Sequence, residues 1–172
     1  MMPMKPTSNR LPIVLLCALA AAIVAFIISH SLQASSGSWA ESNSVAALLE
    51  PVLRGLYDRA GGFLARAGAF AGLTYEEFVR KCAHFAEYAA LGVSCAAITV
   101  LLTRRVASPY LWACLFAVLA IAVADEYAQA FVGRTSLVVD VVIDFSGALA
   151  GIGIALAVAA LVLRRRAGAN RA

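Results

Sequence analysis

The stretch Ala124–Gly151, ADEYAQAFVGRTSLVVDVVIDFSGALAG, places four carboxylates and one arginine within otherwise apolar sequence. An ionised side chain at the centre of a membrane helix costs about 2.5 to 3.5 kcal/mol on insertion scales, so such residues usually face a bundle interior or a polar cavity. The four acids therefore mark the expected functional centre of the chain: Asp125, Glu126, Asp140 and Asp144.

The composition of the 172-residue chain is typical of an integral membrane protein. Hydrophobic residues make up 62% of it and charged residues only 14%, whereas soluble domains carry roughly 25% charged residues. The net charge is +4, and much of the excess lies in short clusters at the chain ends and in one short loop. Such clusters indicate membrane orientation. We therefore expect the lipid bilayer as a partner and no nucleic acid.

Four apolar stretches are long enough to cross a bilayer core of about 30 Å. We expect transmembrane helices over residues 11–30, 82–103, 110–132 and 137–163. The first stretch follows a basic start, as in a signal peptide, but it exceeds a usual signal h-region of roughly 7 to 15 residues, so we expect a retained helix. The predicted fold is an all-α, polytopic bundle of four transmembrane helices.

The segment over residues 31–80 connects the first span to the other three, which form an expected core over residues 81–163. Its charges are spread among Ala, Leu and Phe, a pattern typical of short amphipathic helices at a membrane surface. An ordinary loop packed on the bundle is the alternative. The residues from Thr74 to Glu77 fit a capping box and predict a helix that begins near Tyr75.

Basic residues near the span ends predict the orientation of the bundle. One group lies on a single side of the four-span arrangement: Lys5, Arg10, Arg104, Arg105 and Arg164 to Arg166. That side should be cytoplasmic. Residues 1–10 and the basic tail over residues 164–172 are then both inside, and residues 31–80 are outside. Arg80, Lys81 and Arg134 fall on the outer side, and such exceptions to a general rule are expected at functional sites.

At about 100° per residue, polar side chains share helix faces in each of the last three spans. In the fourth span Asp140 and Asp144 continue a stripe with Gly147 and Gly151, and this glycine spacing favours close helix contact. One outward-facing ligand-binding site should therefore collect Lys81, His84, Glu87, Asp125, Glu126, Gln129, Arg134, Asp140 and Asp144. The candidates for acid–base catalysis in this set are His84, Asp125, Glu126 and Asp140.

Three other interpretations of this polar set remain open. A salt-bridge network could merely fix helix register, although buried ion pairs often stabilise less than apolar packing. His84 and Glu87 at i, i+3 with aspartates opposite match the spacing of helical carboxylate metal sites. With a single histidine and two nearby cations, however, we expect no metal and no cofactor. A Ser/His/Asp hydrolase would need Ser136 or Ser146 to meet His84 without a nucleophile elbow.

A family resemblance rests on four motifs that occur in order. They are Lys81-x-x-His84-Phe-x-Glu87-Tyr88-x-x-Leu91-Gly92, Asp125-Glu126-x-x-Gln129-x-Phe131-x-x-Arg134, Ser136-x-x-x-Asp140 and Gly147-x-x-x-Gly151. In this combination, over about residues 80–151, the chain resembles the VanZ-like membrane proteins. The departure is Asp144, where the family pattern has asparagine. This difference adds an acid and puts in doubt any role that needs a neutral amide there.

The resemblance implies a multi-pass protein of the bacterial inner (cytoplasmic) membrane. The family is named after an accessory protein of glycopeptide-resistance clusters that is linked to reduced susceptibility to teicoplanin, and many similar proteins lie outside such clusters. We therefore expect the outward polar pocket to bind a cell-envelope ligand, either a lipid-linked cell-wall precursor or a glycopeptide. The alternatives are a membrane enzyme that performs acid–base chemistry on a lipid-linked substrate, and a proton-coupled carrier that works as a homo-oligomer.

Overall fold

The structure is a computed structural model that describes residues 10–32, 49–59, 74–133 and 137–169. The described residues form a helix over residues 49–59 together with α1 (Leu11–Ser31), α3 (Tyr75–Thr103), α4 (Tyr110–Phe131) and α5 (Val138–Ala169). The last four are long and apolar enough to cross a membrane. The predicted all-α bundle of four membrane-length helices is therefore confirmed within the described part of the chain.

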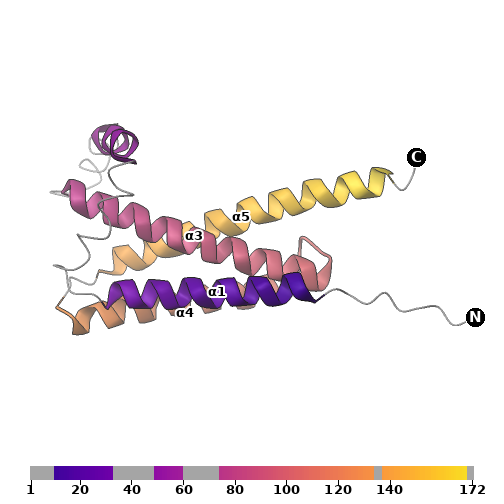
Figure 1. The fold of residues 1–172 in the computed structure, drawn as a ribbon, viewed down its shortest axis with the longest axis horizontal. Helices are drawn as coiled ribbons and strands as arrows, with labels where there is room; N and C mark the ends of the chain where they lie inside the picture. The colour runs from indigo at the N-terminus through magenta and orange to yellow at the C-terminus, as the bar shows by residue number, and fades with distance from the viewer. Residues whose placement is uncertain (1–9, 33–48, 60–73, 134–136, 170–172) are drawn as a thin grey trace, which may run out of the picture.

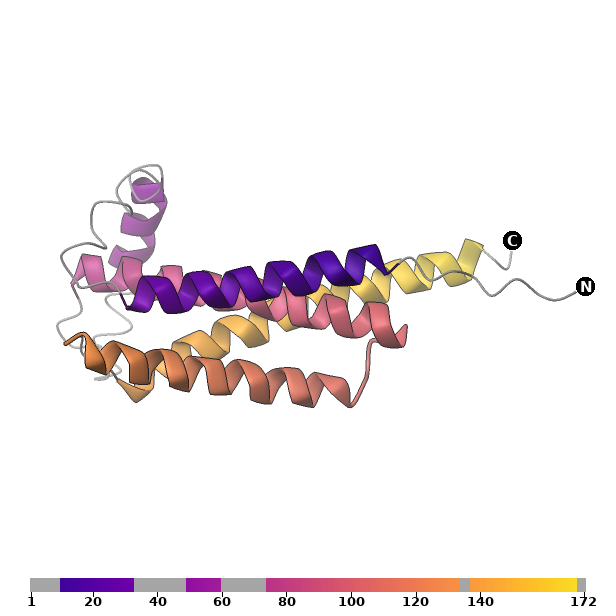
Figure 2. The same cartoon turned by 60° about the horizontal axis from the view of Figure 1, so that its bottom comes forward.

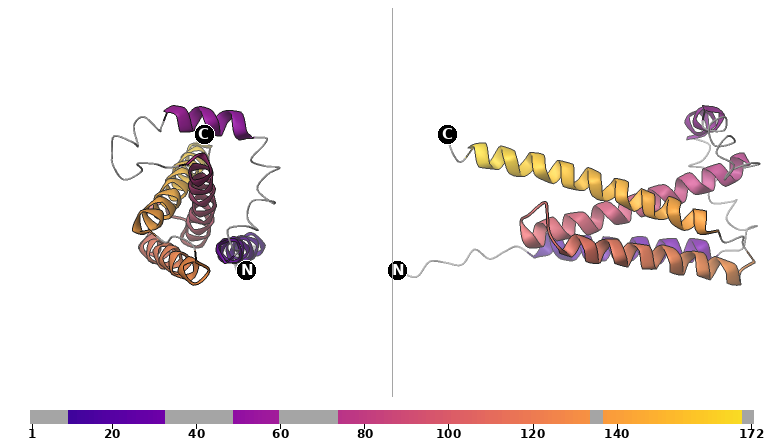
Figure 3. Two further views of the ribbon diagram at one scale, coloured as in Figure 1. Left: turned by 90° about the vertical axis from the view of Figure 1, so that its left-hand side faces the viewer. Right: turned by 180° about the vertical axis from the view of Figure 1, so that it is seen from behind.

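The helices run lengthwise along one bundle, with the start of α1 and the end of α5 at the same end (Figures 1 and 2). The helix over residues 49–59 lies at the opposite end and runs across the bundle axis (Figure 3). The start of α1 and the end of α5 lie at the same end because the chain runs along the bundle four times. It is consistent with the expected topology, in which both termini are cytoplasmic and residues 31–80 are outside, and that orientation stays a prediction.

Local capping determines where α3 begins and ends. The Glu77 backbone N–H donates to Thr74 Oγ1 at 3.3 Å, and the Thr74 backbone N–H donates to Glu77 Oε2 at 2.9 Å. This reciprocal pair is the predicted capping box, so the predicted helix start is confirmed. At the other end Arg104 adopts a left-handed conformation with φ of 57°, and its N–H donates to the Val100 carbonyl. The left-handed residue turns the chain toward α4.

Aromatic contacts attach the helix over residues 49–59 to the start of α3. The ring of Tyr57 meets Tyr75 and Phe78 edge-on, with centroids 5.6 and 5.5 Å apart. The Arg54 guanidinium lies 4.7 Å from the centroid of the Tyr75 ring, within cation–π range. This helix is consistent with the amphipathic elements expected in residues 31–80. The rest of that segment, apart from residues 74–80 in and before α3, lies largely outside the described residues.

The closest helix contact joins α3 and α5, which cross one another (Figures 1 and 3). A Cβ atom added at Gly147 would lie 2.3 Å from the carbonyl oxygen of Phe85. One added at Gly151 would lie 2.0 Å from the carbonyl oxygen of Ala89. Because any side chain would collide with backbone, only glycine permits this approach. The predicted glycine contact surface is confirmed.

A small apolar core lies between the helices, and large apolar side chains cover the outside. The buried core consists of Ile27, Tyr88, Leu91, Val118, Ala122 and Ala148. Exposed residues such as Phe26, Phe116 and Ile154 are more than half accessible, at 57%, 69% and 62%. Apolar exposure of this extent on helices of membrane length is expected where the neighbour is lipid rather than water. The protein is a multi-pass membrane protein.

Candidate functional site

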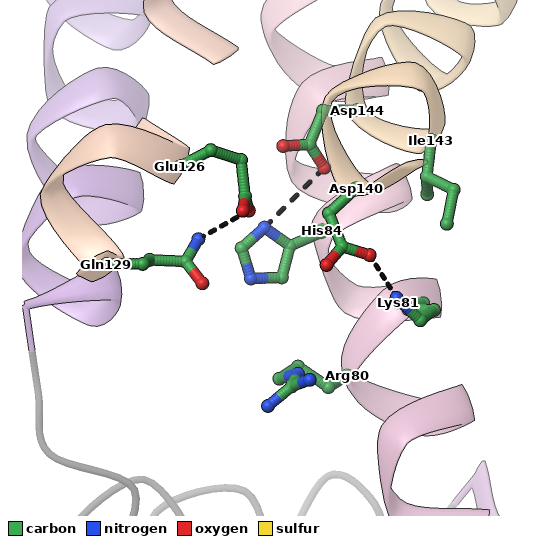
Figure 4. A pocket seen from close by; sticks show the side chains of 8 residues that line it. All are labelled: Arg80, Lys81, His84, Glu126, Gln129, Asp140, Ile143 and Asp144. Carbon is green, nitrogen blue, oxygen red and sulfur yellow. Dashed lines mark hydrogen bonds and ion pairs between the residues drawn. The ribbon is translucent and has the colours of Figure 1, made fainter. Parts of the chain in front are cut away.

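A small, partly open pocket lies between α3, α4 and α5 (Figure 4). Its walls come from the first turns of α3 and α5 and the last turns of α4, so it lies at the bundle end that carries the helix over residues 49–59 (Figure 1). It is lined by Arg80, Lys81, His84, Glu126, Gln129, Asp140, Ile143 and Asp144. All of these except Arg80 and Ile143 belong to the site predicted from the sequence.

An ion pair between Lys81 and Asp140 crosses the pocket wall from α3 to α5. The two residues are 59 positions apart in the chain. Their side chains are only 14% and 15% exposed, so the pair is shielded from most of the solvent. The Lys81 charge is therefore compensated within the protein, and any anionic ligand must compete with the Asp140 carboxylate. Arg80 adds a second cation to the same lining.

His84 faces two carboxylates that come from two other helices. Its Nδ1 atom lies 3.6 Å from Asp144 Oδ1 of α5 and 3.8 Å from Asp125 Oδ2 of α4. All three residues are buried. Within the described part of the chain, their donor atoms lie within 4.8 Å of one another and could hold a metal ion. This group differs from the pairing of His84 with Glu87 that the sequence spacing suggested.

Glu126 has a structural connection to α5. The Leu137 backbone N–H, immediately before α5, donates to Glu126 Oε2 at 3.3 Å. Gln129 Nε2 donates to Glu126 Oε1 at 2.8 Å. A carboxylate beside a helix N-terminus is favourable because the unpaired N–H groups there carry partial positive charge. Both Glu126 oxygens are thus engaged in positioning, which weakens the expectation that Glu126 is a catalytic group.

Two described residues of the predicted set, Glu87 and Asp125, are not part of the pocket lining. Glu87 Oε1 lies 3.8 Å from Nδ1 of His30, a residue of α1. Arg134 lies outside the described residues. The α1 helix also contributes Ser31, which is fully buried and interacts with Asp125. Neither His30 nor Ser31 was predicted as a site residue. Both lie at the end of the first apolar stretch, which is the membrane depth where the sequence placed the site.

A profile of the family described as VanZ/LLP1 matches residues 14–162. The chain belongs to the VanZ/LLP1 family. The match includes nearly all of α1 and most of α5, so it is longer than the stretch of about residues 80–151 that carries the four motifs. No curated protein and no solved structure matches the chain significantly.

The pocket of this VanZ/LLP1 protein combines charges of both signs in a small space. Its enclosed space is only about 10 Å³, roughly what one water molecule needs, so a charged group of a ligand can enter only where the lining side chains move apart. Arg80 and Lys81 suit a phosphate or carboxylate, whereas the acids suit an amine, a hydroxyl or a cation.

Proposed function

We propose that this VanZ-like protein lies in the bacterial cytoplasmic membrane and binds a charged group of a cell-envelope ligand in its outward pocket. One observation carries the proposal: a pocket lined by Arg80, Lys81 and several acids lies at one end of the bundle. The described basic residues that predict a cytoplasmic side lie at the other end: Arg10, Arg104, Arg105, Arg164 and Arg165. The pocket would therefore open toward the outside, where cell-wall precursors and glycopeptides are found.

The proposed ligand group is an anion that displaces Asp140 from Lys81. Phosphate and carboxylate oxygens accept charge-assisted hydrogen bonds from lysine and arginine. Lys81 and Arg134 remain the proposed primary contacts, with Arg80 beside them, and the acids would receive amines or hydroxyls of the same ligand. A lipid-linked precursor carries such phosphates, and a glycopeptide carries carboxylate and amine groups. Capture of either at the outer face would connect the pocket to teicoplanin-type susceptibility.

The test compares the thermal stability of purified full-length protein in detergent with and without total envelope lipid extract. The parent should gain stability from the extract, and Lys81→Gln and Arg134→Ala should lose that gain. Asp140→Asn releases Lys81 from its partner and should bind the anionic ligand more tightly than the parent, by about tenfold for a free-energy change near 1.4 kcal/mol.

Arg105→Gln removes a cation at the opposite end of the bundle and is the matched control. It should retain the full gain in stability. The proposal fails if folded Lys81→Gln and Arg134→Ala both keep the parent's gain, or if the extract stabilises none of the proteins. In that case the pocket charges would serve only the fold.

The position of His84 between two buried carboxylates favours a second candidate, an acid–base enzyme acting on a lipid-linked substrate. An imidazole oriented by a carboxylate is a recurrent general base. His84, Asp125 and Asp140 would be the groups concerned. The same envelope extract, analysed by mass spectrometry after incubation, should then contain a converted lipid that the Asp125→Asn protein does not produce. Failure of the parent to convert any lipid would exclude this candidate.

A further inference from the structure

We propose that His84, Asp125 and Asp144 bind a divalent transition-metal ion. The three side chains come from α3, α4 and α5 and converge on one point, and two of them, His84 and Asp144, line the pocket. Each residue is more than nine-tenths buried, with exposures of 7%, 0% and 1%. One imidazole nitrogen with two carboxylates is a mixed nitrogen and oxygen donor set, which suits ions such as Zn²⁺, Mn²⁺ and Fe²⁺.

The separations of the donor atoms fit three ligands around one ion. His84 Nδ1 is 3.6 Å from Asp144 Oδ1 and 3.8 Å from Asp125 Oδ2, and all donor atoms lie within 4.8 Å of one another. Both histidine distances exceed the range of a direct hydrogen bond. Ligands held at about 2.0 to 2.2 Å from zinc are roughly 3.0 to 3.6 Å apart, so an inward shift of about 1 Å or less completes the geometry.

Buried oxygen atoms at this point provide a second, independent observation. In the part of the chain that the structure describes, both carboxylate oxygens of Asp144 are buried without a hydrogen-bond partner. The Asp144 carboxylate is directed toward His84 (Figure 4). Leaving a buried charged acceptor unpaired is costly, and a cation satisfies several such oxygens at once.

The surrounding charges and hydrogen bonds also suit a cation. Lys81 is engaged by Asp140, so it does not neutralise the two deeper aspartates. A divalent ion with neutral His84 balances both of these carboxylates. Gln129 Nε2 donates to Asp125 Oδ2 at 3.4 Å, a contact of the kind that orients metal-ligating carboxylates.

The metal site goes beyond the proposed function and does not rest on it, because the ion would bind without any envelope ligand. It also departs from the expectation, based on sequence, that the chain holds no metal. That expectation rested on the single histidine and the two nearby cations. The structure brings Asp125 and Asp144 to His84 and engages Lys81 with Asp140.

The experiment titrates full-length protein in detergent, first stripped with a chelator, with Zn²⁺, Co²⁺ and Mg²⁺. We expect saturable binding of about one Zn²⁺ or Co²⁺ per chain, a visible Co²⁺ absorption band that Zn²⁺ abolishes, and much weaker binding of Mg²⁺ because imidazole prefers borderline ions. Metal content after dialysis is measured by mass spectrometry. These readouts use the parent protein and do not depend on the folding of any variant.

Two matched variants locate the ion. Asp144→Asn removes a proposed metal ligand. Loss of a residue that only hydrogen-bonds a metal ligand already lowers metal affinity by up to about 100-fold, so this variant should weaken Zn²⁺ binding by at least that factor. Asp58→Asn makes the same chemical change at an exposed position on the helix over residues 49–59, outside the pocket, and should bind Zn²⁺ like the parent.

The proposal is overturned if the folded parent shows no saturable Zn²⁺ or Co²⁺ binding, or if Asp58→Asn weakens binding as much as Asp144→Asn does. Either result would favour protons shared among His84 and the two aspartates. A lipid-induced gain in stability that persists in the chelator-stripped parent would keep the proposed function while this inference failed. Saturable metal binding by a parent protein that gains no stability from lipid would keep this inference while the proposed function failed.

Discussion

The two halves of the α3–α5 contact are built on opposite principles. Near the crossing point, Gly147 and Gly151 bring the helix backbones into contact through shape alone. One and two turns away on the same face of α5, Asp144 and Asp140 meet charged or polar partners on α3. The glycine contact therefore sets the register and separation of the two helices, and with them the level at which the acids face His84 and Lys81.

The apolar half tolerates no added volume, whereas the polar half tolerates no lost partner. Interiors are closely packed, so an atom placed where backbone already lies must move a helix. A buried charge that loses its partner keeps the cost of leaving water without the compensating attraction. Three predictions follow from this difference, in order of decreasing effect on stability.

The largest effect is expected from Gly151→Leu. A Cβ atom at this position would lie 2.0 Å from the Ala89 carbonyl oxygen, and a leucine adds three more carbons. Overpacking usually costs about 1 to 3 kcal/mol, and we expect more than about 3 kcal/mol here because the obstacle is backbone. Unfolding in detergent measures the change.

The control for this variant is Gly153→Leu, because nothing lies within 4 Å of a Cβ atom at Gly153. Its stability should equal or slightly exceed that of the parent, since leucine is a better helix former than glycine. Equal losses in the two variants would show that the α3–α5 backbone contact does not hold the bundle together.

A middle-sized effect is expected from Lys81→Met, which leaves the Asp140 carboxylate without its partner. Stability should fall by about 1 to 3 kcal/mol, the cost of a buried unpaired acceptor. The double variant Lys81→Met/Asp140→Leu should recover most of the loss, because buried ion pairs replaced by apolar residues are often neutral. If the double variant loses as much stability as the two single variants lose together, each charge acts independently.

The smallest effect is expected from Glu126→Gln. The amide still accepts from the Leu137 N–H but loses the negative charge near the start of α5. The expected loss is about 0.3 to 1 kcal/mol. Glu126→Leu removes the acceptor as well and should cost more, about 1 to 2 kcal/mol, as for the loss of a helix cap. If Glu126→Gln is as damaging as Glu126→Leu, the charge has a role beyond positioning α5.

Features that depend on neighbours within one helix were predictable. The capping box at Thr74 and Glu77 involves residues three positions apart, and its hydrogen bonds are present as expected. The glycine stripe at Gly147 and Gly151 follows from helical periodicity, and its close contact is also present. Both patterns have a single structural outcome once the segment is helical, so neither needed information about distant parts of the chain.

Features that depend on how one helix faces another were not predictable in detail. Glu87 was expected near His84, but the spacing of residues within α3 gave no sign that its carboxylate would also lie 3.8 Å from His30 of α1. Most of the predicted polar set does line one pocket, but the pairs within it involve residues far apart in the chain. Arg80 also lines the pocket, although the sequence had placed it only on the outer side of the bundle and not in the ligand-binding set.

Length, hydropathy and charge placement along the chain were enough to establish four membrane-length helices, the start of α3 and a polar set near one end of the bundle. These properties are local, because a segment that crosses lipid must be a long apolar helix that pairs its own backbone groups, whichever helices surround it. Tertiary structure alone decided that Lys81 pairs with Asp140 and that His84 faces Asp125 and Asp144. The rotation and depth of each helix determine such pairs, and they result from the packing of all four helices, above all from the glycine contact between α3 and α5.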